Sequence, residues 1–244
     1  MADDDGVRTA ERSVLLASVT LGVAVGVFGI AFGVGVISAG GTVVQACAMS
    51  VLVFTGASQF SAVSVIAAGG TTGAALGGAL VLAARNAVYG LSMSRVLVGS
   101  FGTRLAAAQL VIDESTAMAM AQPTLAGRRR AFWTTGVAVF VCWNVGTLLG
   151  AVLGTAVDPQ AWGLDAAFPA GFVAMVAPHL RTRRGLLAGL LGAAICLVLV
   201  PITPIGVPIL AASAAIILGL PGRSPGWDGV AGGGRGGHTM GGTS

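Results

Sequence analysis

Two polar clusters interrupt a long apolar run between Val43 and Tyr89. The first is Phe-Thr-Gly-Ala-Ser-Gln-Phe at Phe54–Phe60, and the second is Ala-Arg-Asn-Ala-Val-Tyr-Gly at Ala84–Gly90. Water does not reach the hydrocarbon of a bilayer, so a polar group left there without a partner costs several kcal/mol. The glutamine and the arginine in this run therefore need protein partners or a water-lined cavity. Such residues are candidates for a functional site.

The first cluster could recognise a substrate that carries both an ammonium and a carboxylate. Gly56 favours a local unwinding that would expose backbone carbonyls, and Ser58 and Gln59 follow it. The Gln59 amide offers both donors and an acceptor, which such a substrate needs. The alternative is that Gln59 makes an interhelical hydrogen bond, worth about 0.6–2 kcal/mol. The sequence leaves both interpretations open.

The second cluster contains Arg85, followed by Asn86, and Arg85 indicates a functional site more clearly than the first cluster does. An arginine at the centre of a membrane helix costs about 2.5–3.5 kcal/mol on insertion scales. Its planar fork suits a carboxylate, whether that of a substrate or that of Asp113 or Glu114. The alternative is that the segment ends here and the side chain extends to the membrane interface.

Asp113 and Glu114 interrupt another apolar stretch. In a continuous helix Gln109, Asp113 and Thr116 share one face, while Glu114 points about 100° away. A carboxylate buried in the bundle favours its neutral form and could carry a proton in each transport cycle, and we expect Asp113 to take this role. The alternative is an amphipathic helix on the membrane surface, with both acids in water.

The remaining polar position is Trp143-Asn144, in the charge-free segment Ala131–Val157. The sequence contains no Ser/His/Asp arrangement, no phosphate-binding loop and no cluster with metal-ligand spacing. The three cysteines are odd in number and lie inside apolar runs, which favours core positions. We therefore expect neither an enzyme nor a cofactor. The predicted substrate-binding residues are Gly56, Ser58, Gln59, Arg85, Asn86, Trp143 and Asn144, and the predicted proton-coupling residues are Asp113 and Glu114.

The composition is that of an integral membrane protein. Only 9% of the 244 residues are charged, against about 25% in ordinary soluble domains, and the mean hydropathy is +0.90. The thirteen basic residues are all arginines. Their densest groups, Arg128–Arg130 and Arg181–Arg184, lie at the ends of apolar segments, as the positive-inside rule requires. This distribution favours a membrane lipid environment over a nucleic-acid partner.

We expect an all-α, polytopic transmembrane bundle of seven or eight membrane segments, with room for broken or re-entrant helices. Residues 1–12 form a cytoplasmic N-terminal segment, residues 13–220 the transporter domain, and residues 221–244 a disordered, Gly-rich cytoplasmic tail. Ser13–Ile37 is longer than a signal-peptide core of about 7–15 residues and is expected to stay as the first span. The other candidate spans are Val43–Ala68, Ala74–Gly99, Leu105–Gln122, Ala131–Val157, Ala166–Leu180, Gly185–Val200 and Ile205–Leu220.

The arginines place both termini in the cytoplasm, so the protein is expected in the cell inner (cytoplasmic) membrane. Eight crossings leave Arg95 and Arg104 on the external side, against the rule. The alternative is that a segment between Val43 and Gly99 re-enters the membrane without crossing it. Two stripes of small residues indicate close helix packing, with partner docking as the alternative. They are Gly22, Gly26, Gly29 and Gly33, and Gly146, Gly150 and Gly154.

These motifs together resemble the AzlC family, the large subunits of branched-chain amino acid exporters (the BrnF and YgaZ types), from about Gly26 to Arg184. The resemblance implies export of leucine, isoleucine, valine or methionine, driven by the membrane potential or a proton gradient. It also implies a small membrane partner of the AzlD/BrnE type. The competing function is a non-transporting assembly or sensor subunit that docks a partner through the glycine stripes. The resemblance is carried by Gly56–Phe60, Arg85 with Tyr89-Gly90, Asp113-Glu114, Trp143 ahead of the second glycine stripe, and Ala166-Ala167 leading to Pro178.

Overall fold

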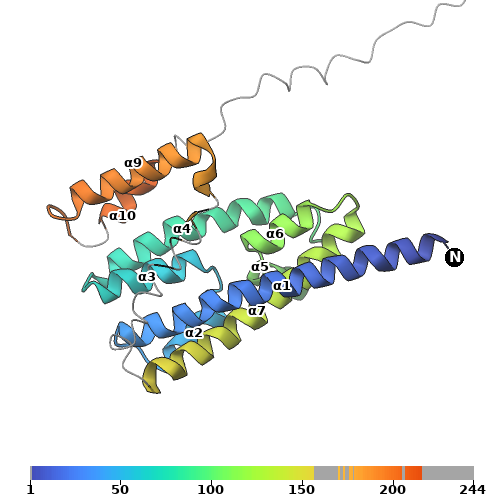
Figure 1. Cartoon of the computed structure of the whole chain (residues 1–244), viewed down its shortest axis with the longest axis horizontal. Coiled ribbons are helices and arrows are strands. Elements are labelled where there is room, and N and C mark those ends of the chain that lie inside the picture. Colours follow the sequence, from blue (N-terminus) through green and yellow to red (C-terminus); the bar gives the residue numbers. More distant parts are fainter. Residues whose placement is uncertain are drawn as a thin grey trace, which may run out of the picture.

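The computed structural model describes residues 2–156, 179–204 and 207–215, together with residues 170, 173, 176 and 177. Every regular element in these residues is a helix, and three helices are long and apolar enough to cross a membrane (Figure 1). This confirms an all-α protein with membrane-spanning helices. The elements are α1 (Ala2–Ser38), α2 (Val43–Leu52), α3 (Ala57–Ala67), α4 (Thr72–Met93), α5 (Phe101–Gln109), α6 (Asp113–Met120), α7 (Leu125–Ala156), η2 (His179–Arg181), α9 (Arg183–Leu199), α10 (Val207–Ala212) and η3 (Ser213–Ala215).

The three spanning helices match three of the expected segments. They are α1 from Glu11 to Ser38, α4 and α7. The expected segment Gly185–Val200 corresponds to α9, which packs against α10, while α10 also contacts α4. The expected span Ala166–Leu180 and the tail 221–244 lie largely or wholly outside the described residues, as do parts of Ile205–Leu220.

The frame of the protein is a parallel pair formed by α1 and α7. Ser18 Oγ lies 2.8 Å from Thr135 Oγ1 in the first half of both helices. Gly154 lies against Ile37 near their ends. The residue numbers rise together along the contact, so both helices run in the same direction, as Figure 1 shows.

The two glycine stripes face each other along this pair. A Cβ atom added at Gly26 would lie 3.0 Å from the carbonyl oxygen of Cys142, and one at Gly29 would lie 2.6 Å from that of Trp143. Only small residues allow two helix backbones to approach this closely in lipid. The packing interpretation of the stripes is therefore confirmed. Neither stripe is free to dock a partner.

The expected span Val43–Ala68 is not one continuous helix, which corrects the sequence-based assignment. It is divided into α2 and α3 by residues 53–56, where Gly56 has a φ of +60°. The two helices have 10 and 11 residues, so each is about 15 Å long, half of a hydrocarbon core of about 30 Å. Gln59 Nε2 donates to the carbonyl oxygen of Met49 at 3.0 Å, which ties the start of α3 to the last turn of α2. The segment is a hairpin of two half-length helices.

The expected span Leu105–Gln122 is a second hairpin, made of α5 and α6. The chain enters and leaves it at one end of the molecule, because Arg129 Nε donates to the carbonyl oxygen of Val96 at 2.7 Å. Its tip reaches the first hairpin, where Gln109 Nε2 donates to the carbonyl oxygen of Val51 at 2.7 Å. The helix breaks at residues 110–112. Gln109 therefore does not share one continuous helical face with Asp113 and Thr116, which both belong to α6, and that prediction is wrong.

The two hairpin tips meet halfway along α7. The ring of Phe54, in the first tip, lies 5.0 Å from the ring of Phe140. Leu110, in the second tip, packs on Gly136. These α7 positions are four residues apart, or about 6 Å along the helix axis. The hairpins thus enter from opposite ends and stop at the same depth.

The arginines gather at the end of the molecule where α1 and α7 begin. Glu11 of α1 forms an ion pair there with Arg130 of α7. Arg95, Arg104, Arg128 and Arg129 belong to the same end, and of the arginines in residues 2–156 only Arg85 lies away from it. The positive-inside rule predicts that this end is cytoplasmic. Because α2 and α3 form a hairpin, Arg95 and Arg104 lie at the same end of the molecule as Arg128 and Arg129, which agrees with that rule.

The close contact between α1 and α7 is testable at Gly150. A Cβ atom there would press into the backbone of Ile30, whereas a Cβ atom at Gly90 of α4 would meet nothing within 4 Å. Overpacking costs about 1–3 kcal/mol, so Gly150→Ala should lower the thermal midpoint in detergent by about 4–10 °C. Gly90→Ala should leave the midpoint unchanged or raise it slightly, because alanine is the better helix former. Equal midpoints for the two variants would contradict the assigned contact.

Candidate functional site

A small cavity lies where the two hairpin tips meet between α1, α4 and α7. Its volume is about 70 Å³, room for a few water molecules. The lining comes from five parts of the chain, which no single stretch of sequence could supply. The lining residues are Val25 and Phe28 of α1, Phe54, Thr55 and Gly56 of the first tip, Arg85 of α4, Ile112, Asp113 and Glu114 of the second tip, and Val139 and Trp143 of α7.

An ion pair between Arg85 and Asp113 crosses this cavity. Arg85 Nη1 lies 3.3 Å from Asp113 Oδ2, and the two side chains are 33% and 39% exposed. Arg85 stands in the interior of the 22-residue helix α4, and its head group reaches the second tip. Of the two interpretations of Arg85, the structure thus shows the one in which its side chain pairs with a carboxylate, that of Asp113. The alternative, in which the side chain extends to the membrane interface, does not hold.

Asp113 and Glu114 both line the cavity, which corrects the expectation that only one of them faces the interior. They form the first turn of α6, immediately after the helix break, and this end of the helix points at the cavity, so two side chains about 100° apart around the helix axis both reach it. Acidic residues are favoured in a first turn by the positive end of the helix dipole. The cavity holds two carboxyl groups and a single guanidinium.

Gln59 shapes the first tip and does not line the cavity. Its side chain is fully buried. Its Oε1 accepts from the backbone N–H of Gly56 at 3.1 Å and from that of Thr55 at 3.4 Å, while its Nε2 binds Met49. The interhelical hydrogen bond, one of the two interpretations left open, is what the structure shows. Ser58 is also buried and pairs with the hydroxyl of Thr55, so Gly56 is the one predicted residue of this motif on the cavity wall.

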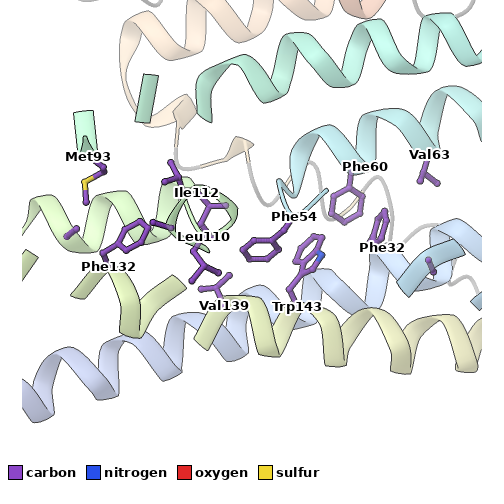
Figure 2. Close-up of a cluster of buried hydrophobic side chains, with 14 of the residues drawn as sticks. Phe32, Phe54, Phe60, Val63, Met93, Leu110, Ile112, Phe132, Val139 and Trp143 are labelled. Atoms are coloured by element: carbon purple, nitrogen blue, oxygen red, sulfur yellow. The ribbon is translucent and has the colours of Figure 1, made fainter. Parts of the chain in front are cut away.

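Trp143 forms part of an aromatic layer on the outer side of the cavity. Its ring stacks on Phe32 and meets Phe60 edge to face, both with centroids 5.9 Å apart. Figure 2 shows these three rings on one side of Phe54, and Leu110 with Ile112 on the other side. The indole N–H of Trp143 is buried and has no hydrogen-bond partner among the described residues. It is an available donor beside the cavity.

Two predicted binding residues lie outside the cavity wall. Asn144 turns back along α7, where its Nδ2 donates to the carbonyl oxygen of Phe140 at 2.8 Å. Asn86 follows Arg85 on α4 but does not line the cavity. The sequence analysis missed the apolar wall contributed by Val25, Phe28 and Val139. These side chains resemble every other apolar residue of their helices, so no sequence signal distinguished them.

Comparison with known proteins gives one family. Residues 20–157 match the family model described as AzlC protein, which is more than half of the chain. The matched stretch contains both hairpins, both glycine stripes and every residue of the cavity. No curated protein and no solved structure matches the chain.

The capping role of Gln59 predicts a loss of stability when the amide is removed. Gln59→Leu leaves the part-buried N–H groups of Thr55 and Gly56 without their partner, at about 1–3 kcal/mol for each group that stays unsatisfied, whereas the Met49 carbonyl oxygen keeps its bond from the N–H of Val53. We expect the thermal midpoint in detergent to fall by about 5–10 °C. Gln45→Leu is the matched control, because Gln45 caps α2 in the same way at an exposed position. Its midpoint should fall by less than about 3 °C, and a fall as large as that of Gln59→Leu would exclude the proposed role of the buried tip.

Proposed function

The chain belongs to the AzlC family, a family associated with amino-acid transport and export, and from this premise we propose that it is a secondary-active exporter of branched-chain or similar small neutral amino acids. The observation that carries the proposal is the Arg85–Asp113 ion pair in a cavity between two half-length hairpins. Transporters commonly place substrate sites at mid-membrane depth, where discontinuous helices end. The protein is proposed to act in the cytoplasmic membrane.

The charges of the cavity suit a zwitterion. The Arg85 guanidinium can take the substrate carboxylate, and the Asp113 carboxylate can take the substrate ammonium. The N-terminus of α3 begins at Gly56 on the cavity wall, and its dipole also favours a carboxylate. The apolar wall of Phe28 and Val139 would hold an aliphatic side chain. A substrate without net charge replaces the ion pair without leaving an unpaired charge behind.

The cavity is too small for its substrate in the present conformation. Its 70 Å³ is well below the roughly 300–1,000 Å³ of ordinary ligand sites. Admission of an amino acid therefore requires the two tips to separate from each other or from α7. A hairpin that ends at mid-depth can move while α1 and α7 stay together, which is the motion that alternating access needs.

Proton coupling is proposed to use Glu114. Asp113 already has the guanidinium as its partner, whereas Glu114 adds a second carboxyl group to the same cavity. Two neighbouring carboxylates beside one cation are less favourable than one carboxylate and one protonated acid. Uptake of a proton by Glu114 and its release on the other side would couple transport to the proton gradient. This replaces Asp113, the residue that the sequence favoured.

The competing function is an assembly subunit that docks a partner through its glycine stripes. These stripes pack against each other, so they are not available as a docking surface. A small AzlD-type membrane subunit remains part of the proposal, and it would have to use other helix faces. Leucine efflux from cells that express the chain with and without such a subunit tests whether the small subunit is required for export.

Replacement of Arg85 tests the substrate site. Arg85→Ala should reduce leucine efflux at least about 30-fold, which corresponds to about 2 kcal/mol of lost binding to a charged group. Arg85→Lys should recover little of this loss, because the ammonium lacks the planar fork. Efflux of radiolabelled leucine from loaded cells is the measurement, normalised to the amount of protein in the membrane.

Arg95→Ala is the matched control, since Arg95 closely follows α4 but does not line the cavity. It should retain efflux close to that of the original chain. Normal leucine efflux in Arg85→Ala would overturn the assignment of the cavity.

Replacement of Glu114 tests the coupling. Glu114→Gln removes the titrating group but keeps the shape, so leucine counterflow in reconstituted vesicles should persist while accumulation driven by a proton gradient is lost. Asp113→Asn should impair both activities, because it deprives Arg85 of its partner. If Glu114→Gln accumulates leucine as the original chain does when a proton gradient is imposed, Glu114 is not the carrier.

A further inference from the structure

A second and larger cavity opens at the cytoplasmic end of the protein, between the end of α4 and α5. Its volume is about 420 Å³, within the range of sites that hold small organic ligands. Gly90 and Ser94 contribute to one wall, and Ala107 and Ala108 to the other. We call it the α4–α5 groove.

Arg104 is the one charged residue among those that line the α4–α5 groove. It stands in the first turn of α5, and its side chain is exposed. No acidic residue lines the groove beside it. The groove therefore offers a positive charge above small and apolar surfaces, which is the chemistry that holds the carboxylate of an aliphatic amino acid.

The groove adjoins the central cavity through the tip of the second hairpin. Val111 lines the groove, and the next residue, Ile112, lines the central cavity. Residues 110–112 are not helical, and all three side chains are buried. A thin segment of apolar chain is thus what separates the two spaces.

On its opposite side the central cavity is closed by a layer of aromatic side chains, which is a thicker barrier than the segment 110–112. Phe32 and Phe60 are fully buried and pack on Trp143 in the layer beyond the cavity. Opening on that side would require three aromatic rings to part. The described conformation is therefore closer to cytoplasmic access than to external access.

We propose that the α4–α5 groove is the cytoplasmic capture site for the exported amino acid, where Arg104 binds the substrate carboxylate. Residues 110–112 then move aside, and the carboxylate passes to Arg85 in the central cavity. This inference rests on the proposed function and adds to it a second cation and a path. Arg104 is a substrate-binding residue of the groove that raises the local concentration of substrate at the second tip.

Cysteine labelling tests the groove. In a chain whose native cysteines are replaced by serine, Ser94→Cys places a thiol on the groove wall, and Ser92→Cys places one on α4 outside it. An anionic, membrane-impermeant thiosulfonate added from the cytoplasmic side should modify Ser94→Cys and block leucine transport. Leucine at ten times its apparent Kd should slow this modification about tenfold, because only the unoccupied groove reacts. Modification of Ser92→Cys should not be slowed by leucine.

Kinetics of Arg104 provide the second test. Arg104→Gln should raise the KM for leucine about fivefold, as expected for an exposed charge pair, and leave the maximal rate of transport unchanged. Arg95→Gln is the control of equal charge at the same end of the protein, and its KM should not change. A structural role for Arg104 would instead lower the maximal rate.

The two proposals fail in different ways. Absence of leucine transport by the unmodified chain, with and without its small subunit, would overturn the proposed function. If the unmodified chain transports leucine and needs Arg85, but leucine does not protect Ser94→Cys and Arg104→Gln keeps its KM, the capture site is wrong. In that case the groove holds a lipid or the partner subunit.

Discussion

Backbone hydrogen bonding in the interior of the membrane is the constraint on which this structure depends. A helix that stops at mid-depth leaves N–H and C=O groups without partners, and lipid cannot supply any. Each tip meets this demand with a polar side chain. In the first tip the Gln59 amide binds Gly56 and Met49, and in the second the Ser115 hydroxyl lies 3.2 Å from the N–H of Ile112 and donates to the carbonyl oxygen of Leu110 at 2.6 Å. These side chains allow an irregular backbone to persist beside the cavity.

The glycine contact between α1 and α7 provides the fixed surface against which the hairpins pack. The two helices lie close enough for the main chain of one to contact the main chain of the other. Hydrogen bonds between hydroxyl groups, Ser18 with Thr135 and Ser50 with Thr147, tie α1 and α2 to α7 in the same layer. Dense packing on one side leaves movement to the hairpin tips, whose contacts with α7 are aromatic and aliphatic side chains. Under the proposed function, stability and transport would thus depend on different parts of the chain.

The arrangement also explains how an arginine can stay at mid-depth. Arg85 faces a carboxylate and a cavity, so its charge is neither unpaired nor in contact with hydrocarbon. The same ion pair leaves no unpaired guanidinium in the empty cavity. Under the proposed function, a zwitterionic substrate would replace each half of the pair with an equivalent charge of its own, so that recognition and the stability of the empty state would use the same two residues.

The sequence by itself determined the class, the polar motifs and the packing stripes. Hydropathy and charge define membrane residence, and the spacing of Gly22, Gly26, Gly29 and Gly33 places them on one helix face, because helical periodicity is local. Gly56, Arg85, Asp113, Glu114 and Trp143 stood out in the sequence as polar or aromatic groups within apolar runs, and all five line the cavity.

Tertiary structure decided what the sequence left open. Composition does not distinguish a helix that crosses the membrane from two half-length helices that return, so residues 43–68 and 105–122 were assigned as continuous spans. The role of Gln59 as a cap depends on the position of Met49 across the hairpin, and the pairing of Arg85 with Asp113, where the sequence offered Asp113 or Glu114, depends on the position of the second tip beside α4. Each of these outcomes follows from contacts between distant segments, and such contacts arise only when the hairpins pack against the α1–α7 pair.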